Sequence, residues 1–457
     1  MRDHRRNVGL CDVIAEAGCT YEALARMVIR VAAENGDRVL TNRSAITHWI
    51  SGTKPTGRMP AYLAEALTRK TGRPVAVAEL GFASLPGQDG VVPSPFGPDS
   101  IGSLSDLGRA DLDRRLDRRS VLFSAAILPL SAAWLAEADE RGQWSGELGG
   151  QVGQAEVDTV RAITEAFNRA DETLGGGHGR AAVVQYLVTD VAAFCSARFS
   201  DDETRRAMFG AAAELAYLAG WKAHDIGAEG LAQQYYARSL QLAKESDPRG
   251  HAAWCGRILA HQALDLGRPN ECVALATRAW DLVRGHVDPA TEALFSITAA
   301  RAHAAAGHPR PALRALLRAE DSLASGRDED MPHWASLTGH VAATVTSNAG
   351  KTFAALGNHA CAEERFSAAA AVRGSEGFRR AGALNLAQVA DAQAAQGHAD
   401  QACDSWSTAL TYMRGISSDR HRKAVTNARQ HLHTFKRRGV PGAALLDQRC
   451  VELLASS

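Results

Sequence analysis

The side chains of this sequence that could bind a charged partner recur at fixed distances from five glycines, which are Gly227, Gly267, Gly307, Gly357 and Gly397. The positions six residues before each glycine hold Trp221, His261, Arg301, Lys351 and Asp391. The positions ten residues before hold Tyr217, Arg257, Ile297, Ser347 and Ala387. Arg and Lys bind carboxylate and phosphate groups, and aromatic rings stack on cations. These residue types therefore predict recognition rather than catalysis.

Sequence motifs for catalysis or metal binding do not accompany these residues. There is no GxxxxGK followed by Ser or Thr, no GxSxG and no HExxH. The GGGHG segment at 175–179 follows no strand pattern and is predicted to be a flexible loop. The histidines of the HLH segment at 431–433 would point to different faces of a helix, which disfavours a shared metal ion. We expect no enzyme activity, no cofactor and no metal site.

Two helices joined at each glycine would position the recurring side chains. The flanking stretches are rich in Ala and Leu with helical spacing, and glycine permits the positive φ of a tight turn. Small residues stand seven positions before and five after the glycines: Gly220, Ala260, Ala300, Gly350 and Ala390, then Ala232, Cys272, Ala312, Ala362 and Ala402. Nine positions after stand mostly bulky residues, Tyr236, Ala276, Leu316, Phe366 and Trp406, which we expect to fill gaps between neighbouring hairpins. Such copies stack into an all-α superhelix, or α-solenoid.

This pattern resembles the tetratricopeptide repeat family, whose consensus has small, Gly, Ala, aromatic and Ala residues at these spacings. The resemblance covers roughly residues 205–415, with a period of forty residues instead of about 34. The longer period predicts longer helices or longer links between hairpins. Helical segments at 154–172, 181–198, 419–436 and 441–454 are predicted to be degenerate or capping units. A generic Ala-rich helical bundle is the alternative.

The resemblance implies which side chains line the concave face, because the first helix of each hairpin faces inward in that family. The implied groove consists of Tyr217, Trp221, Trp254, Arg257, His261, Arg301, Asn348, Lys351 and Gln388. Its cations would attract an anionic ligand, and Asn348 and Gln388 could hold a peptide backbone. The ligand is predicted to be a peptide, a small molecule or a protein partner. The alternative is that these are ordinary solvated charges.

Residues 1–82 are predicted to form a separate helical head. The segments GLCDVIAEAG, TYEALARMVIRVAAENG, NRSAITHWISG and MPAYLAEALTRKTG suggest four helices, and VAVAELGF suggests a closing element. Thr20 and Asn42 are the expected N-caps of the second and third helices. This segment carries twelve Lys and Arg against eight Asp and Glu, which fits an anionic partner.

The segment ITHWISGTKP resembles the recognition-helix end of the Cro/XRE-type helix-turn-helix family, and LARMV resembles the Leu-Ala stretch of its preceding helix. Ile46 and Trp49 would anchor one face, leaving the other free for a major groove. The resemblance implies DNA contacts by Arg43, Ser44, Thr47, His48, Lys54, Arg58, Thr20 and Tyr21. The twenty-two residues from Leu24 to Ile46 exceed the family spacing, so the helix is presented differently. A head used only for dimerisation is the alternative.

The segment 83–120 is predicted to be a flexible linker, because it is rich in Gly, Pro, Ser and Asp. Its end, DLGRADLDRRLDRRS, is expected to form a solvated helical face. The repeat body then covers 121–457. Its apolar run at 121–135 is shorter than the roughly 20 residues that span a bilayer, so we expect a buried helix and no stable membrane insertion. The run is also a candidate dimer interface, and a membrane-contacting segment is the alternative.

The whole chain resembles actinobacterial transcriptional regulators that join such a head to a tetratricopeptide-repeat body. The resemblance implies a homodimer that binds a double-stranded DNA operator and is modulated through the repeat groove. Eight scattered cysteines without a CxxC pair and the lack of a signal peptide indicate the cytoplasm. The alternative function is a tetratricopeptide interaction scaffold that does not bind DNA.

Overall fold

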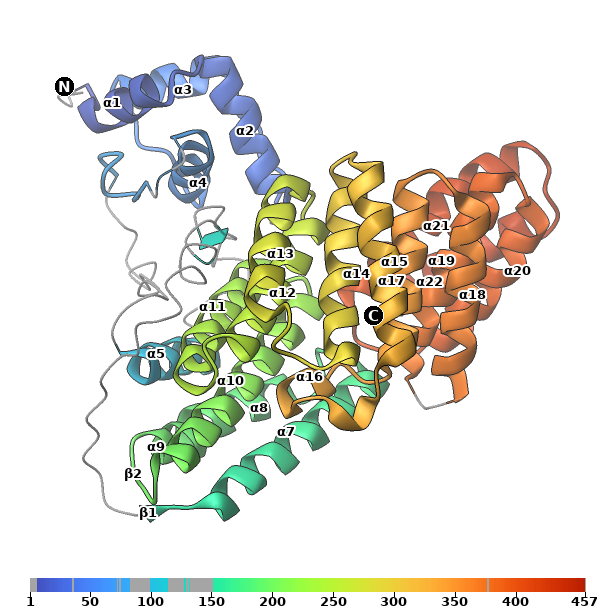
Figure 1. Ribbon diagram of the computed structural model, residues 1–457. Coiled ribbons are helices and arrows are strands. Elements are labelled where there is room, and N and C mark those ends of the chain that lie inside the picture. The colour runs from blue at the N-terminus through green and yellow to red at the C-terminus, as the bar shows by residue number, and fades with distance from the viewer. Residues whose placement is uncertain are drawn as a thin grey trace.

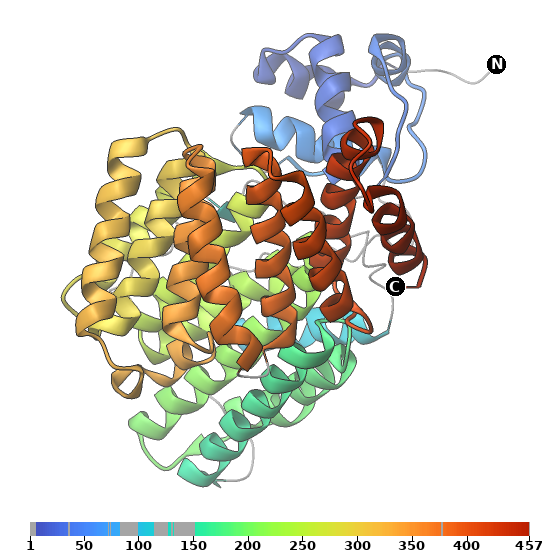
Figure 2. The same ribbon diagram turned by 90° about the vertical axis from the view of Figure 1, so that its right-hand side faces the viewer.

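The computed structural model is an all-α structure with a small helical head and a curved body of helical hairpins (Figures 1 and 2). It describes residues 6–34, 37–71, 73, 75–82, 99–113, 127–128, 131, 151–375 and 378–456. The strands in these ranges are β1 (Gln151–Val152) and β2 (Arg198–Phe199), which form one short parallel pair. The predicted fold class, a helical head joined to an α-solenoid of hairpins, is confirmed.

The head contains α1 (Val8–Ala17), α2 (Tyr21–Glu34), α3 (Arg43–Ile50) and α4 (Met59–Thr71). Its core is apolar, with Leu10, Leu24, Ile46 and Leu67 fully buried. The expected cap of α3 forms, because the Asn42 side chain accepts a hydrogen bond from the Ala45 amide at 3.0 Å. The Thr20 hydroxyl likewise accepts from the Ala23 amide at 3.2 Å and caps α2. The VAVAELGF segment closes the head as a turn over 77–81.

The body contains six hairpins, which lie side by side in Figure 1. They pair α10 (Asp202–Asp225) with α11 (Glu229–Ser246), α12 (Gly250–Asp265) with α13 (Pro269–Val283), α14 (Pro289–Ala305) with α15 (Pro309–Ser325), α17 (Val341–Ala355) with α18 (His359–Ser375), α19 (Arg379–Gln396) with α20 (Ala399–Met413), and α21 (Asp419–Arg437) with α22 (Ala443–Ser456). The five glycines of the series lie at the turns of the first five hairpins with φ between 71° and 87°. This backbone conformation is costly for residues other than glycine, which explains why glycine recurs at these turns.

The bulky residue nine positions after the glycine packs within its own hairpin and also, as expected, against the next one, as Trp406 does on Phe435 of α21. A Cβ placed on Gly220 would lie 2.7 Å from ring atoms of Tyr236. The same distance separates a Cβ on Gly350 from the ring of Phe366. The small residue seven positions before the turn therefore makes room for the large one across the hairpin, as close packing requires.

The fifty-residue interval between Gly307 and Gly357 contains an insertion. It holds the 3-10 turn η2 (Asp328–Asp330) and the short helix α16 (His333–Ser336), which packs against α10 and α12. The His333 ring lies 2.7 Å from a Glu214 carboxylate oxygen and 3.1 Å from one of Glu165. Trp334 stacks on His251 with ring centroids 5.7 Å apart. The insertion is therefore bound to the inner side of the first hairpins.

The helix α7 (Gln154–Leu174) closes the superhelix, because it packs against both α10 in the first hairpin and α19 in the fifth. After α7, the chain continues through α8 (Arg180–Tyr186), the π-helix η1 (Leu187–Val191) and α9 (Ala192–Cys195) to α10. The GGGHG segment between α7 and α8 is not the free loop that the sequence predicted. The Gly176 amide donates to Asp225 at 2.9 Å, and the Gly177 amide donates to the Ser417 carbonyl at 3.3 Å.

The buried Arg380 holds α19 to α7 and α10. Its guanidinium lies 2.7 Å from Glu172, 3.1 Å from Asp171 and 3.2 Å from Asp225. Asp171 also accepts from the ammonium of Lys222 at 3.1 Å. Two cations thus neutralise three carboxylates at a seam in which Glu172 and Arg380 are 208 residues apart.

The predicted flexible linker 83–120 is wrong in part, because it contains the helix α5 (Ser100–Leu112) packed against α11 and α8. Asp111 is buried in this contact and accepts from Arg180 at 2.5 and 2.9 Å and from the Tyr235 hydroxyl at 2.9 Å. Within the described part of the expected solvated face, 106–113, Leu107, Gly108 and Asp111 are therefore buried. Within the apolar run 121–135, Ile127, Leu128 and Ser131 are helical and buried, and the rest lies outside the described residues. Across the described residues, no helix is long and apolar enough to cross a membrane.

Candidate functional site

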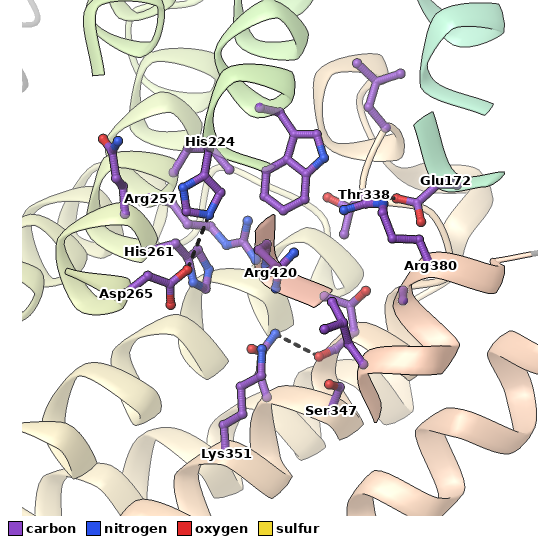
Figure 3. A pocket seen from close by; sticks show the side chains of 18 of the residues that line it. Glu172, His224, Arg257, His261, Asp265, Thr338, Ser347, Lys351, Arg380 and Arg420 are labelled. Carbon is purple, nitrogen blue, oxygen red and sulfur yellow. Dashed lines mark hydrogen bonds and ion pairs between the residues drawn. The ribbon is translucent and has the colours of Figure 1, made fainter. Parts of the chain in front are cut away.

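The concave side of the body holds a cavity of about 200 Å³ inside the closed superhelix. It is lined from α7, the first helices of all six hairpins and the segment after α16, with Tyr236 of α11 and Arg373 of α18. Eight of the predicted groove residues line it: Tyr217, Trp221, Arg257, His261, Arg301, Asn348, Lys351 and Gln388. The periodic positions of the sequence therefore converge on one space. Figure 3 shows His224, His261 and Asp265 on one side, Glu172 and Arg380 on the other, and Arg420 between them.

Trp254 is the exception among the predicted groove residues. It is 2% exposed and lies in the core, where its ring packs on Phe295 and Trp334 with centroids 6.0 and 5.7 Å away. The Arg257 guanidinium lies 4.4 Å from the Trp254 ring centroid, and its Nε donates to the Leu294 carbonyl at 3.0 Å. Trp254 therefore positions Arg257 through a cation–π contact and does not itself line the cavity.

A chain of polar contacts fixes the His261 side of the cavity. The His261 ring lies 2.8 Å from Arg301 and 3.0 Å from the Thr298 hydroxyl. Arg301 also lies 3.5 Å from Asp265. Burial lowers the pKa of His261 well below its usual value, and the neighbouring Arg257 and Arg301 act in the same direction. We expect His261 to be neutral and Arg301 to carry the charge.

The neighbouring His224 behaves in the opposite way. Its ring lies 2.9 Å from Glu229 and 3.5 Å from Asp265. Burial acts to lower its pKa, but the two carboxylates outweigh burial and raise the pKa to about 9. His224 is therefore a buried imidazolium that holds α10 to α11 and α12.

Because the pKa of His224 is raised on folding, its contribution to stability is fully present below about pH 6.5 and is lost as the pH rises through about 9. We expect the free energy of unfolding to fall by an amount on the order of 2–3 kcal/mol over this interval. Denaturant titrations at pH 6 and pH 9 should show this loss in the wild type and a smaller loss in His224→Gln. Equal pH dependence in both proteins would contradict the assignment.

Four further cations face the cavity from other elements, and they differ in how well they are paired. Arg380 is neutralised by its three carboxylates. Arg373 donates only to the Thr344 hydroxyl, at 3.0 Å. Arg420 lies 5.3 Å from the centroid of Trp221 without an ion pair among the described residues. Within the same ranges, Lys351 has no hydrogen bond or ion pair.

Desolvation is the main consequence of this arrangement. Burial lowers the pKa of Arg257 to about 9 and that of Arg373 to about 10. Burial also lowers the pKa of Lys351 far below its usual value, and Arg301 and Arg420 add to this effect. The carboxylates in the lining, Glu172 and Asp265, act in the opposite direction but do not outweigh burial and the neighbouring cations. The site can bind an anion, and the negative charge of that anion would stabilise the buried cations.

Several lining residues escaped the sequence reasoning: Glu172, His224, Asp265, Arg373, Arg380 and Arg420. His224 stands three residues before Gly227, a position that also faces inward in the family, so the repeat pattern could have identified it. Glu172, Arg380 and Arg420 come together only through the closure by α7, for which the sequence contains no periodic signal. Among the described residues, no cluster of metal-binding side chains is found.

In the head, Arg43, Ser44, Thr47 and His48 are all exposed on α3, while Ile46 and Trp49 are buried, 0% and 8% exposed. Lys54 is also exposed just beyond the helix. The face proposed to read DNA is therefore open to solvent.

The remaining predicted DNA contacts are placed less favourably. Arg58 does not project as a free cation, because it lies 2.9 Å from Asp37 and packs on the Tyr62 ring. Thr20 is exposed but serves as the N-cap of α2, and Tyr21 is partly buried against the core. Arg58 is better described as the residue that joins the 37–42 segment to α4.

These features define a helical-repeat protein with a separate N-terminal helical head. Residues 10–83 match the SP15 N-terminal domain family, so the match covers the head and not the body. No curated protein sequence matches the chain. Among solved structures, the chain is similar to a Rap protein complexed with Competence and Sporulation Factor, with 14% identity and a TM-score of 0.40. This similarity covers 81% of the chain and 99% of the Rap protein.

Proposed function

We propose that the protein is a DNA-binding transcriptional regulator whose repeat body binds a ligand that modulates it. The observation that carries the proposal is the amphipathic division of α3, which buries Ile46 and Trp49 and exposes Arg43, Thr47 and His48. A short exposed helix with a basic, hydrogen-bonding face fits a major groove. The exposed Lys54 just past the helix is placed to contact phosphate.

The cavity supports the second half of the proposal. A ligand changes DNA binding only if it has different affinities for two arrangements of the protein. The head and body meet where Glu34, at the end of α2, lies 2.7 Å from Arg69 and 3.9 Å from Arg268 at the start of α13. The α12–α13 hairpin also supplies Arg257 and His261 to the cavity. Movement of this hairpin on ligand binding would therefore change its contact with the head.

The DNA-binding half is tested with Arg43→Ala and His48→Ala. Genome-wide immunoprecipitation first identifies sites for the wild type, and gel shifts at fixed salt then measure affinity. We expect Arg43→Ala to weaken specific binding roughly tenfold to a hundredfold, because one bidentate contact to guanine contributes about 1–3 kcal/mol. His48→Ala should have a smaller effect. The control Arg438→Ala removes an exposed cation from the body and should leave affinity unchanged.

The outcome also distinguishes the alternative function. If the wild type binds no specific site, the protein is an interaction scaffold and the head serves another contact. Weak, salt-sensitive binding alone would not support the proposal, because any basic surface binds DNA in that way.

We further propose that the regulator is a cytoplasmic homodimer that catalyses no reaction. A two-fold pair of heads would read two half-sites, with a spacing set by the body. Light scattering at micromolar concentration tests the dimer, and a monomeric mass with intact DNA binding would contradict it.

A further inference from the structure

The charged side chains that line the cavity indicate which kind of ligand it binds. Six Arg and Lys side chains line it against two carboxylates, Glu172 and Asp265. Both carboxylates are already engaged, Glu172 by Arg380 at 2.7 Å and Asp265 by Arg301 and His224 at 3.5 Å. The remaining four cations, which are Arg257, Lys351, Arg373 and Arg420, have no carboxylate partner among the described residues. The cavity lining therefore contains several cationic side chains without carboxylate partners.

The neutral side chains around these cations also present donors. Asn385 is 2% exposed, its oxygen accepts from the Ser347 hydroxyl at 2.8 Å, and its Nδ2 has no hydrogen-bond partner. A buried N–H without an acceptor is costly, and a ligand oxygen would satisfy it. In the same lining, Gln262 Oε1 and Gln388 Oε1 also lack hydrogen-bond partners, so the cavity favours an anionic ligand that carries acceptor oxygens together with a donor such as a hydroxyl.

The shape of the cavity limits the size of that ligand. The segment after α16 places Leu337 and Thr338 in the lining, and the Asn168 side chain of α7 donates to the Leu337 carbonyl at 3.1 Å. With α7 also packed against α10 and α19, the lining surrounds the cavity from several sides. The space that the lining leaves, about 200 Å³, suits a small ligand.

We propose that the ligand is a compact metabolite with at least two phosphoryl groups. This proposal rests on the function proposed above. Each phosphoryl group carries between one and two negative charges near pH 7 and offers three acceptor oxygens. Two such groups match the four unpaired cations and the Asn385 donor within a small volume. Arg257, Lys351 and Arg373 are the proposed phosphoryl contacts.

Inorganic pyrophosphate is the probe, with inorganic phosphate, citrate and an acidic peptide as comparisons. Calorimetry and thermal unfolding of the full chain should show pyrophosphate binding more tightly than the other three. Arg257→Gln and Lys351→Met should each weaken pyrophosphate binding more than about tenfold, because a hydrogen bond between charged groups contributes more than that factor. Arg43→Ala is the control for binding to the basic head and should leave the affinity unchanged.

A second measurement needs no ligand. Lys351→Met replaces a cavity-lining lysine that has no hydrogen bond or ion pair among the described residues by an apolar side chain, so it should raise the melting temperature of the ligand-free protein by about 2 °C or more. A lower melting temperature would show that Lys351 is structural and would overturn its assignment.

The other outcomes separate the two proposals. Equal or tighter binding of citrate or the peptide overturns the phosphoryl assignment, as does pyrophosphate binding that depends on Arg43. If pyrophosphate binds in the cavity but leaves operator affinity unchanged, the ligand class stands and the modulation proposed above fails. If operator binding is intact and pyrophosphate does not bind, the ligand class fails alone.

Discussion

Arg380→Ala is expected to destabilise the protein by about 3–5 kcal/mol. Arg380 is 2% exposed and contacts Asp171, Glu172 and Asp225, of which Asp171 and Asp225 have fully buried side chains. Removing the guanidinium leaves Asp225 with only the Ser418 hydroxyl and the Gly176 amide as partners. An uncompensated buried carboxylate carries a large desolvation cost, which explains the size of the effect.

Denaturant unfolding followed by circular dichroism measures this change. The matched control is Arg379→Ala, because Arg379 is the adjacent residue on α19 but is exposed and donates only to the Arg414 carbonyl, at 3.2 Å. It should change the free energy of unfolding by no more than about 0.5 kcal/mol. Similar unfolding midpoints for the two variants would mean that the closure contributes little to stability.

Trp406→Ala is expected to cost about 3–5 kcal/mol, for reasons of packing rather than charge. Trp406 stands nine residues after Gly397, is 1% exposed, and packs against His431 and Phe435 of the next hairpin. Its indole N–H also donates to Asp391 at 3.1 Å, so truncation removes a hydrogen bond and leaves a cavity.

The control for this prediction lies on the same helix. Tyr412 on α20 is 44% exposed, so Tyr412→Ala should change stability by less than about 0.5 kcal/mol. The same denaturation experiment compares the two variants. A small effect of Trp406→Ala would show that the large residue of the repeat is not needed for hairpin packing.

The repeat body could be predicted from the sequence because the residues that define each hairpin stand at fixed, short distances from one another along the chain. A turn glycine, a small residue seven positions before it and a large one nine after it all act within one hairpin, as Gly350, Gly357 and Phe366 illustrate. The large residue contacts both its own hairpin and the next one, as Phe366 does with Gly350 and Trp406 does with Phe435. Period alone cannot tell these two kinds of contact apart.

The sequence predicted only those cavity residues that belong to the repeat series. His261, Arg301 and Lys351 stand six residues before a turn glycine and Arg257 stands ten before, and all four converge on the inside of the superhelix. Glu172, which faces them, belongs to a helix outside the repeat series. Contacts between segments that are far apart in the chain follow from the three-dimensional path, which no local pattern encodes.

The linker prediction failed for a related reason. The composition of 83–120 is typical of a flexible segment, yet Asp111 within it pairs with Arg180 and Tyr235. A few long-range contacts thus override local composition. In the head, caps and apolar spacing were sufficient, because Thr20, Asn42 and Ile46 act on their own helices.

The seam at Arg380 has a consequence for how the chain folds. An open array of repeats can fray from its ends, because each unit contacts only its neighbours. Here α7 cannot complete its contacts until the ribosome has released the segment that carries Arg380 and Ser417. We therefore expect the first and fifth hairpins to unfold together, and chains truncated before α19 to remain dependent on chaperones.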